Sequence, residues 1–234
     1  DKKRNTLLGF MSVGFFHVLS GLDHLVFLIG LALVARKPRL AFLCITGFTL
    51  GHTASLGFAA YGLISPDSRL VEALIGFTIA IMALEAAAKN GNRRRAFLAF
   101  AVLALAVSFA PLSGQGTWLF GLCLAIYVGA SGFIPEGPAR KTLPLLTIAF
   151  GLIHGAGFAG GLQERSLSQA NLAKPLIGFN IGVELAQLLA LAIIYVLMFG
   201  LGKYAPKVRR PVEIVATLVI FGLGCFWFAS RLWG

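Results

Sequence analysis

The chain has 234 residues, of which 58% are hydrophobic and only 12% are charged, and its net charge is +11. Average soluble domains are about 25% charged, whereas a mean hydropathy of +0.85 is typical of an integral membrane protein. The basic residues lie in short stretches between apolar runs, as topology signals do, and not on a separate soluble domain. This pattern excludes the nucleic-acid partner that a positive net charge would otherwise favour.

Eight apolar segments follow one another, and most are long enough to cross about 30 Å of hydrocarbon as a helix. Stretches such as Arg36-Lys37-Pro38-Arg39 and Ser65-Pro66-Asp67 separate them. The sequence therefore predicts an all-α protein, with residues 1–234 forming a single membrane domain: a polytopic bundle of about seven or eight transmembrane helices. The segments are expected at about 6–34, 40–63, 70–88, 96–112, 117–134, 143–162, 175–202 and 212–232.

Positive charge predicts the orientation of these segments. If they alternate across the bilayer, 13 of the 20 Lys and Arg residues lie on one side. That side is expected to face the cytoplasm, so both termini face outward, and a bacterial inner membrane is the expected location. The chain begins with Asp1-Lys2-Lys3-Arg4 and no initiator Met. We therefore expect an extracytoplasmic domain to precede this membrane domain.

The first apolar segment contains two histidines and an aspartate. His17 and His24 are seven residues apart, which places them two turns from each other on a continuous helix, with Ser20 and Gly21 between them on the same face. Asp23 is turned about 100° away from His24, so we expect it to support a ligand or to face a second helix. Ionisable groups at this depth are costly and indicate a functional site.

Polar residues also interrupt three later segments. His52 follows Thr49 in the second segment, and His154 lies among glycines in the sixth. In the seventh, Asn180, Glu184 and Gln187 share one helical face at positions i, i+4 and i+7. An isolated carboxylate in hydrocarbon must be neutralised or find partners. We therefore expect Glu184 to face a cation, a proton or a histidine.

Imidazole and carboxylate together suit nickel, cobalt, zinc or copper(II). For each histidine, the alternative of a simple interhelical hydrogen bond stays open. A second group of polar residues is expected to orient the ligands. The candidate ligands are His17, His24, His52, His154, Asp23 and Glu184, and the candidate orienting residues are Ser20, Thr49, Asn180 and Gln187.

The spacing of His17, five residues, then Asp23-His24 resembles the HupE/UreJ family, as do the flanking Gly14-Phe15-Phe16 and Leu25-Val26-Phe27. Stretches 48–53 and 179–184 look like further family motifs. The resemblance implies a small polytopic nickel permease or an accessory protein of hydrogenase and urease maturation. A looser likeness is to nickel/cobalt permeases. The stretch around His154 has one histidine and no acidic residue where the family has a second His- and Gly-rich motif, which indicates a divergent branch.

Three functions follow from these residues. The first is a transporter for a divalent transition metal (nickel, cobalt or zinc), with the histidines and Glu184 replacing the water of the ion. The second is an intramembrane zinc-dependent hydrolase of lipid or peptide, with Asp23 or Glu184 as general base, although the chain has no H-E-x-x-H motif. The third is a haem-bearing or structural membrane anchor. The expected partners are the lipid bilayer and the metal ion, and a homo-oligomer stays open.

Overall fold

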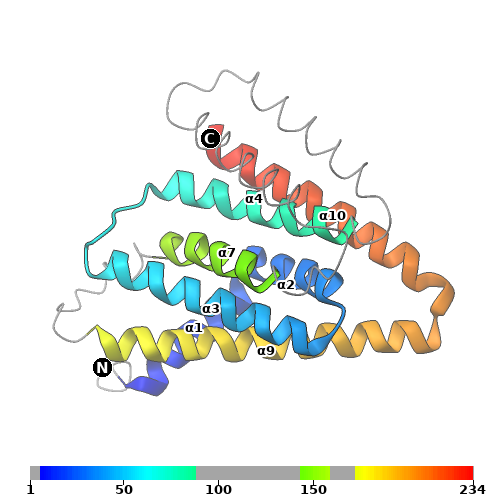
Figure 1. The fold of residues 1–234 in the computed structure, drawn as a ribbon, viewed down its shortest axis with the longest axis horizontal. Coiled ribbons are helices and arrows are strands. Elements are labelled where there is room, and N and C mark those ends of the chain that lie inside the picture. Colours follow the sequence, from blue (N-terminus) through cyan, green and yellow to red (C-terminus); the bar gives the residue numbers. More distant parts are fainter. Residues whose placement is uncertain (1–5, 88–142, 159–171, 234) are drawn as a thin grey trace.

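The computed structural model describes residues 6–87, 143–158 and 172–233 (Figure 1). All regular elements in these ranges are helices, and α3, α4, α9 and α10 are each long and apolar enough to span a membrane. The predicted all-α membrane bundle is confirmed, while the predicted segments 96–112 and 117–134 lie outside the described residues. The helices are α1 (Leu7–Ser20), α2 (Leu22–Ala35), α3 (Pro38–Ala60), α4 (Ser68–Ala87), α7 (Leu143–Gly157), α9 (Ala173–Tyr204) and α10 (Pro206–Trp233).

The first apolar segment is not one continuous helix. It breaks at Gly21, and the axes of α1 and α2 are bent by 73°. Gly21 has an extended backbone (φ −82°, ψ 105°), and its N–H closes the last turn of α1 on the carbonyl of His17. The expectation that His17 and His24 share one face of a straight helix is therefore wrong, because the chain changes direction between them.

The bent pair nevertheless advances across the bundle. α1 begins beside the start of α9, where Gly178 contacts the backbone of Leu7. α3 and α9 run in opposite directions (Figure 1), and His52 meets Asn180. Counted from the pair of His52 and Asn180, Pro38 at the start of α3 lies about level with residue 194 of α9. α1 and α2 together therefore advance from the level of Gly178 to that of residue 194, which is about 24 Å at 1.5 Å per residue. This is close to the thickness of the hydrocarbon core, and we interpret α1 and α2 as one broken span.

Glycines hold the three closest helix pairs together. On α3, a Cβ at Gly51 would collide with the backbone of Ile148 on α7, and Gly151 on α7 has the same relation to Phe48. Gly14 and Gly182 do the same between α1 and α9, and Gly76 and Gly224 between α4 and α10. Membrane helices associate through such small residues because these let backbones approach closely.

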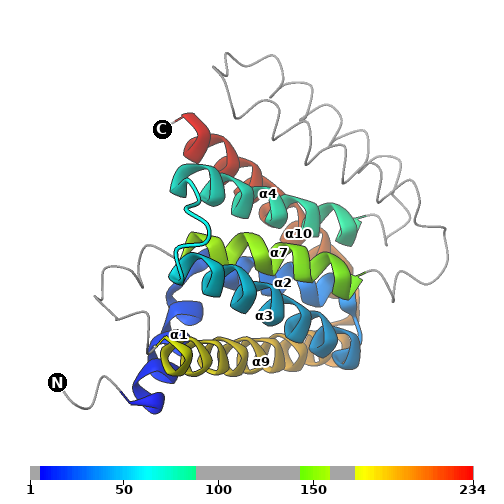
Figure 2. The same cartoon turned by 60° about the vertical axis from the view of Figure 1, so that its left-hand side comes forward.

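These contacts also fix the relative directions of the helices. The residue numbers of the contacting positions rise together on α1 and α9, and on α3 and α7, so the two helices of each pair are parallel. On α4 and α10 the numbers rise in opposite directions, so this pair is antiparallel. The directions agree with the strict alternation predicted for the eight segments. α4 and α10 form one side of the bundle, α1 and α9 form the opposite side, and α2, α3 and α7 lie between them (Figures 1 and 2).

The last two helices are longer than predicted. The basic stretch 203–211 was expected to be a loop, but α9 continues to Tyr204 and α10 begins at Pro206. Proline is favoured at the first helical position because its missing N–H needs no partner there. The connection between the two helices is therefore reduced to Ala205.

The glycine contact between α3 and α7 can be tested by adding one methyl group. We expect Gly51→Ala to destabilise the protein by about 1–3 kcal/mol, because the new Cβ meets the backbone of Ile148 and forces the helices apart. Gly57→Ala on the same helix is the matched control, since a Cβ there meets nothing within 4 Å. The measurement is the thermal unfolding midpoint in detergent, and equal midpoints for the two variants would contradict the prediction.

Candidate functional site: a buried histidine cluster

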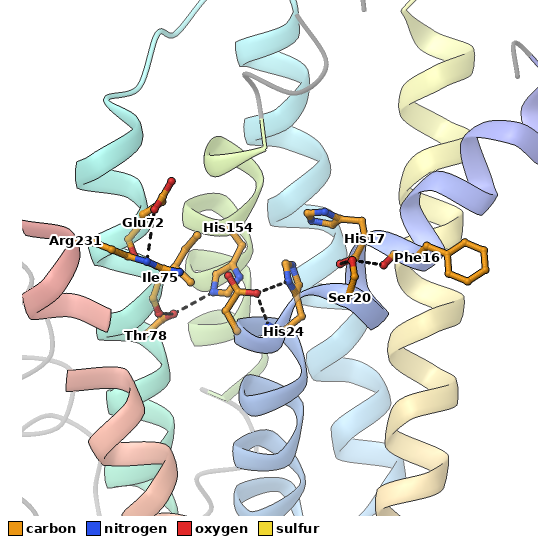
Figure 3. Close-up of polar contacts among 10 residues, drawn as sticks. Phe16, His17, Ser20, His24, Glu72, Ile75, Thr78, His154 and Arg231 are labelled. Carbon is orange, nitrogen blue, oxygen red and sulfur yellow. Dashed lines mark hydrogen bonds and ion pairs between the residues drawn. The ribbon is translucent and has the colours of Figure 1, made fainter. Parts of the chain in front are cut away.

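Three histidine rings from three helices form a continuous row inside the bundle (Figure 3). The ring of His24 on α2 is central. Its centroid lies 4.8 Å from that of His17 on α1 and 5.4 Å from that of His154 on α7. The bend at Gly21 brings His24 against His17 and towards α7 at once, which a straight helix would not do.

The aspartate beside His24 holds one nitrogen of its ring. Oδ1 of Asp23 lies 3.0 Å from Nδ1 of His24 and also accepts the backbone N–H of His24 at 2.9 Å. A Cβ at Gly21 would lie 2.7 Å from that Nδ1 and 2.9 Å from Oδ1, so the glycine leaves the space that the pair occupies. An ionised carboxylate only accepts hydrogen bonds. Nδ1 therefore carries the hydrogen, and Nε2 of His24 keeps its lone pair.

His52 on α3 is fixed in the same way by α9. Its Nδ1 lies 3.0 Å from Oδ1 of Asn180. The amide nitrogen of Asn180 donates to the carbonyl of Leu176 at 2.8 Å, which assigns the amide oxygen to the side facing His52. Nδ1 of His52 is therefore the donor, and Nε2 keeps the lone pair.

His154 on α7 is held by α4. Its Nε2 lies 3.1 Å from the hydroxyl of Thr78. That hydroxyl uses its one hydrogen in a 2.8 Å bond to the carbonyl of Ile75, so it accepts from His154. Nε2 carries the hydrogen here, and Nδ1 keeps the lone pair. Sequence reasoning missed Thr78, because it stands alone in a long apolar stretch.

Because one nitrogen of each of these three histidine rings is hydrogen-bonded, the other nitrogen keeps a free lone pair. Nε2 of His24, Nε2 of His52 and Nδ1 of His154 are buried and have no hydrogen-bond partner in the described part of the chain. An unsatisfied buried acceptor costs about 1–3 kcal/mol. A neutral imidazole that donates one N–H to a protein oxygen and keeps the other nitrogen free is the form that binds metal ions.

Phenylalanine rings surround the cluster. Phe158 packs on His17 with ring centroids 4.3 Å apart, and Phe48 packs on His154 at 5.0 Å. His52 is stacked between Phe48 and Phe179, at 6.1 and 6.0 Å. These rings line the free nitrogens with apolar surface and separate His52 from the row of the other three histidines.

The distances fit two rings on one ion better than a closed cage. Two imidazoles bound at about 2.1 Å to one ion have ring centroids about 4.5–5.2 Å apart, and His17 and His24 are 4.8 Å apart. Within residues 6–87, 143–158 and 172–233, no group of three or more His, Cys, Asp or Glu side chains is placed to hold one ion. The spacing of His17 and His24 is therefore compatible with two imidazole ligands on one ion.

The other predicted residues lie elsewhere. Ser20 is exposed and donates to the carbonyl of Phe16 on its own helix at 2.7 Å. Thr49 donates to Oε1 of Gln187 at 3.3 Å. Glu184 accepts from the hydroxyl of Thr46 at 3.0 Å, a partner that the sequence analysis did not name.

Comparison with known proteins supports the sequence resemblance. The family model described as "HupE / UreJ protein" matches residues 1–117 and 119–231, nearly the whole chain. No curated protein and no solved structure matches the chain. The match suggests a nickel/cobalt transporter or an accessory membrane protein.

The bond between Asp23 and His24 can be tested with an isosteric change. We expect Asp23→Asn to weaken nickel binding about 10–100-fold, because the ring of His24 loses the charged group that holds it. Binding is measured by titration calorimetry on the detergent-solubilised protein. Glu72→Gln is the control, since Glu72 is an exposed carboxylate 3.5 Å from Arg231. An unchanged affinity in Asp23→Asn would rule out this role for the carboxylate.

Proposed function

Since the chain belongs to the HupE/UreJ family, we propose that it is a membrane permease for a divalent transition-metal ion of the nickel/cobalt class. His17, His24 and His154 bind the ion along their row, His52 offers a further imidazole beyond Phe48 and Phe179, and Asp23 supplies the nearby negative charge. Glu184 is hydrogen-bonded to Thr46 and stays outside this ligand set. Asn180 and Thr78 hold the rings of His52 and His154.

The observation that carries the proposal is the set of three buried nitrogens with free lone pairs. Each ring is oriented by a hydrogen bond at its other nitrogen, so the ligands need little rearrangement to meet an ion. Imidazole nitrogen suits nickel, cobalt, copper and zinc better than magnesium or calcium. The donor type thus favours a transition metal as the substrate.

The row of rings also suits transport. A permease must bind its ion well enough to select it and weakly enough to release it. Spacings of 4.8 and 5.4 Å along His17, His24 and His154 let one ion exchange one imidazole for the next. The broken span at Gly21 places this row within the bundle, as discontinuous helices do in transporters.

The proposed setting is a bacterial inner membrane with both termini outward. The excess of Lys and Arg on one side of the predicted segments supports this orientation. The relative directions of the described helices support the alternation on which that count depends. A cysteine introduced at Asn90 is expected to react only with a membrane-permeant thiol reagent.

The function is tested by metal uptake into proteoliposomes that contain the purified chain. We expect saturable uptake of nickel or cobalt, and a loss of at least about tenfold in His24→Ala, because the central ring of the row is gone. Thr53→Ala is the matched control, since the hydroxyl of Thr53 donates only to the carbonyl of Thr49 on its own helix.

The same preparation separates the alternatives. One tightly held zinc ion per chain without uptake would favour the intramembrane hydrolase. A Soret absorbance band would favour the haem-bearing anchor. Uptake that His24→Ala leaves unchanged would refute the histidine path.

A further inference from the structure

A second polar group lies between α3 and α9, beyond the bond from His52 to Asn180. It consists of Thr46, Thr49, Glu184 and Gln187, which we call the oxygen cluster. Thr46 donates to Oε1 of Glu184 at 3.0 Å, and Thr49 donates to Oε1 of Gln187 at 3.3 Å. All four contacting atoms are oxygens, in contrast to the nitrogens of the histidine cluster.

The two hydrogen bonds cross between α3 and α9, within about one helical turn. α3 and α9 are antiparallel and are aligned by the bond between His52 and Asn180 (Figure 1). Thr49, three residues before His52, is therefore about level with Glu184, and Thr46 with Gln187. Each threonine nevertheless bonds to the residue opposite the other threonine. The two crossing hydrogen bonds thus bring the four oxygens into about one turn of the interface between α3 and α9.

The oxygen cluster contains one carboxylate, Glu184, which forms no ion pair with a Lys, Arg or His of the described residues. The ion pairs found there join His24 to Asp23, Arg209 to Glu213 and Arg231 to Glu72. Glu184 is half-buried on α9, which is apolar enough to span the membrane, and Gln187 is 1% exposed. A carboxylate at this depth is costly unless a positive charge accompanies it.

From this charge and this donor set, we propose that the oxygen cluster binds a monovalent alkali-metal cation, sodium. One carboxylate, one amide carbonyl and two hydroxyls are hard oxygen ligands, which suit hard cations and not nickel or cobalt. Calcium sites usually gather several carboxylates and magnesium keeps most of its water. A single carboxylate is instead neutralised by a single positive charge.

The position of the oxygen cluster gives the cation a role that rests on the proposed function. Thr49 and His52 are one turn apart on α3, and Asn180 and Glu184 are one turn apart on α9. A cation that draws the four oxygens together acts directly on the helices that hold His52 against Asn180. Sodium binding is therefore coupled to the orientation of a transition-metal ligand.

The experiment measures the thermal unfolding midpoint of the full chain in detergent, without transition metal, as sodium chloride replaces choline chloride at constant ionic strength. We expect a saturable rise of about 5 °C at about a hundredfold excess over the Kd. Glu184→Gln and Thr46→Val should lose this rise. Thr53→Val, an isosteric change at a hydroxyl that bonds within α3, should keep it.

The outcomes separate this site from the permease function. His24→Ala should keep the sodium response, because it removes only the transition-metal path. An equal response to choline and sodium, or a sodium response retained in Glu184→Gln, would overturn the proposal. If Glu184→Gln does not fold, Thr46→Val decides in the same way. A sodium response without nickel uptake would refute the permease and leave the sodium site standing.

Discussion

Asp23, Asn180 and Thr78 each form a hydrogen bond to one nitrogen of a buried histidine. These three hydrogen bonds fix the orientation of the imidazole rings at the centre of the bundle. Inside a bilayer, polar side chains find partners only within the protein. Each bond fixes a ring and its tautomer, and leaves the second nitrogen as a lone pair among phenylalanine rings. The same constraint that orients the histidines therefore leaves the three free nitrogens on which the proposed ion binding depends.

The glycine contacts make this arrangement possible. α3 and α7 approach so closely at Gly51, Gly151 and Gly155 that their backbones touch, and this parallel pair carries His52 and His154. The bend at Gly21 then turns α2 so that His24 meets both His17 and α7. The close glycine contacts and the break at Gly21 together bring histidines from four helices near one another.

The sequence predicted the helices well, because uninterrupted apolar runs allow hardly any other structure in a membrane. It also singled out the four histidines and Asp23 as candidates, because they stand out against their apolar surroundings, and the structure brings His17, His24 and His154 together. The break at Gly21 was not predictable. Gly21 is one of 28 glycines in the chain, and most of the glycines in the described residues lie within uninterrupted helices. Thr78 was missed for a related reason: its importance depends on α4 lying beside α7, a contact that no local spacing reveals.

The hydroxyl partner of Glu184 was not predictable either, for a different reason. The helical spacing of Glu184 from Asn180 and Gln187 was correct, and all three side chains do face α3. The spacing could not give the register between two helices that are far apart in sequence, and this register places Thr46, not a histidine, against the carboxylate. One interface thus changes within two turns from the contact of His52 with Asn180 to the oxygens of Thr46 and Glu184. Because α3 and α9 carry both groups, the sodium ion proposed at the oxygen cluster would act on His52 through the helices that the two groups share.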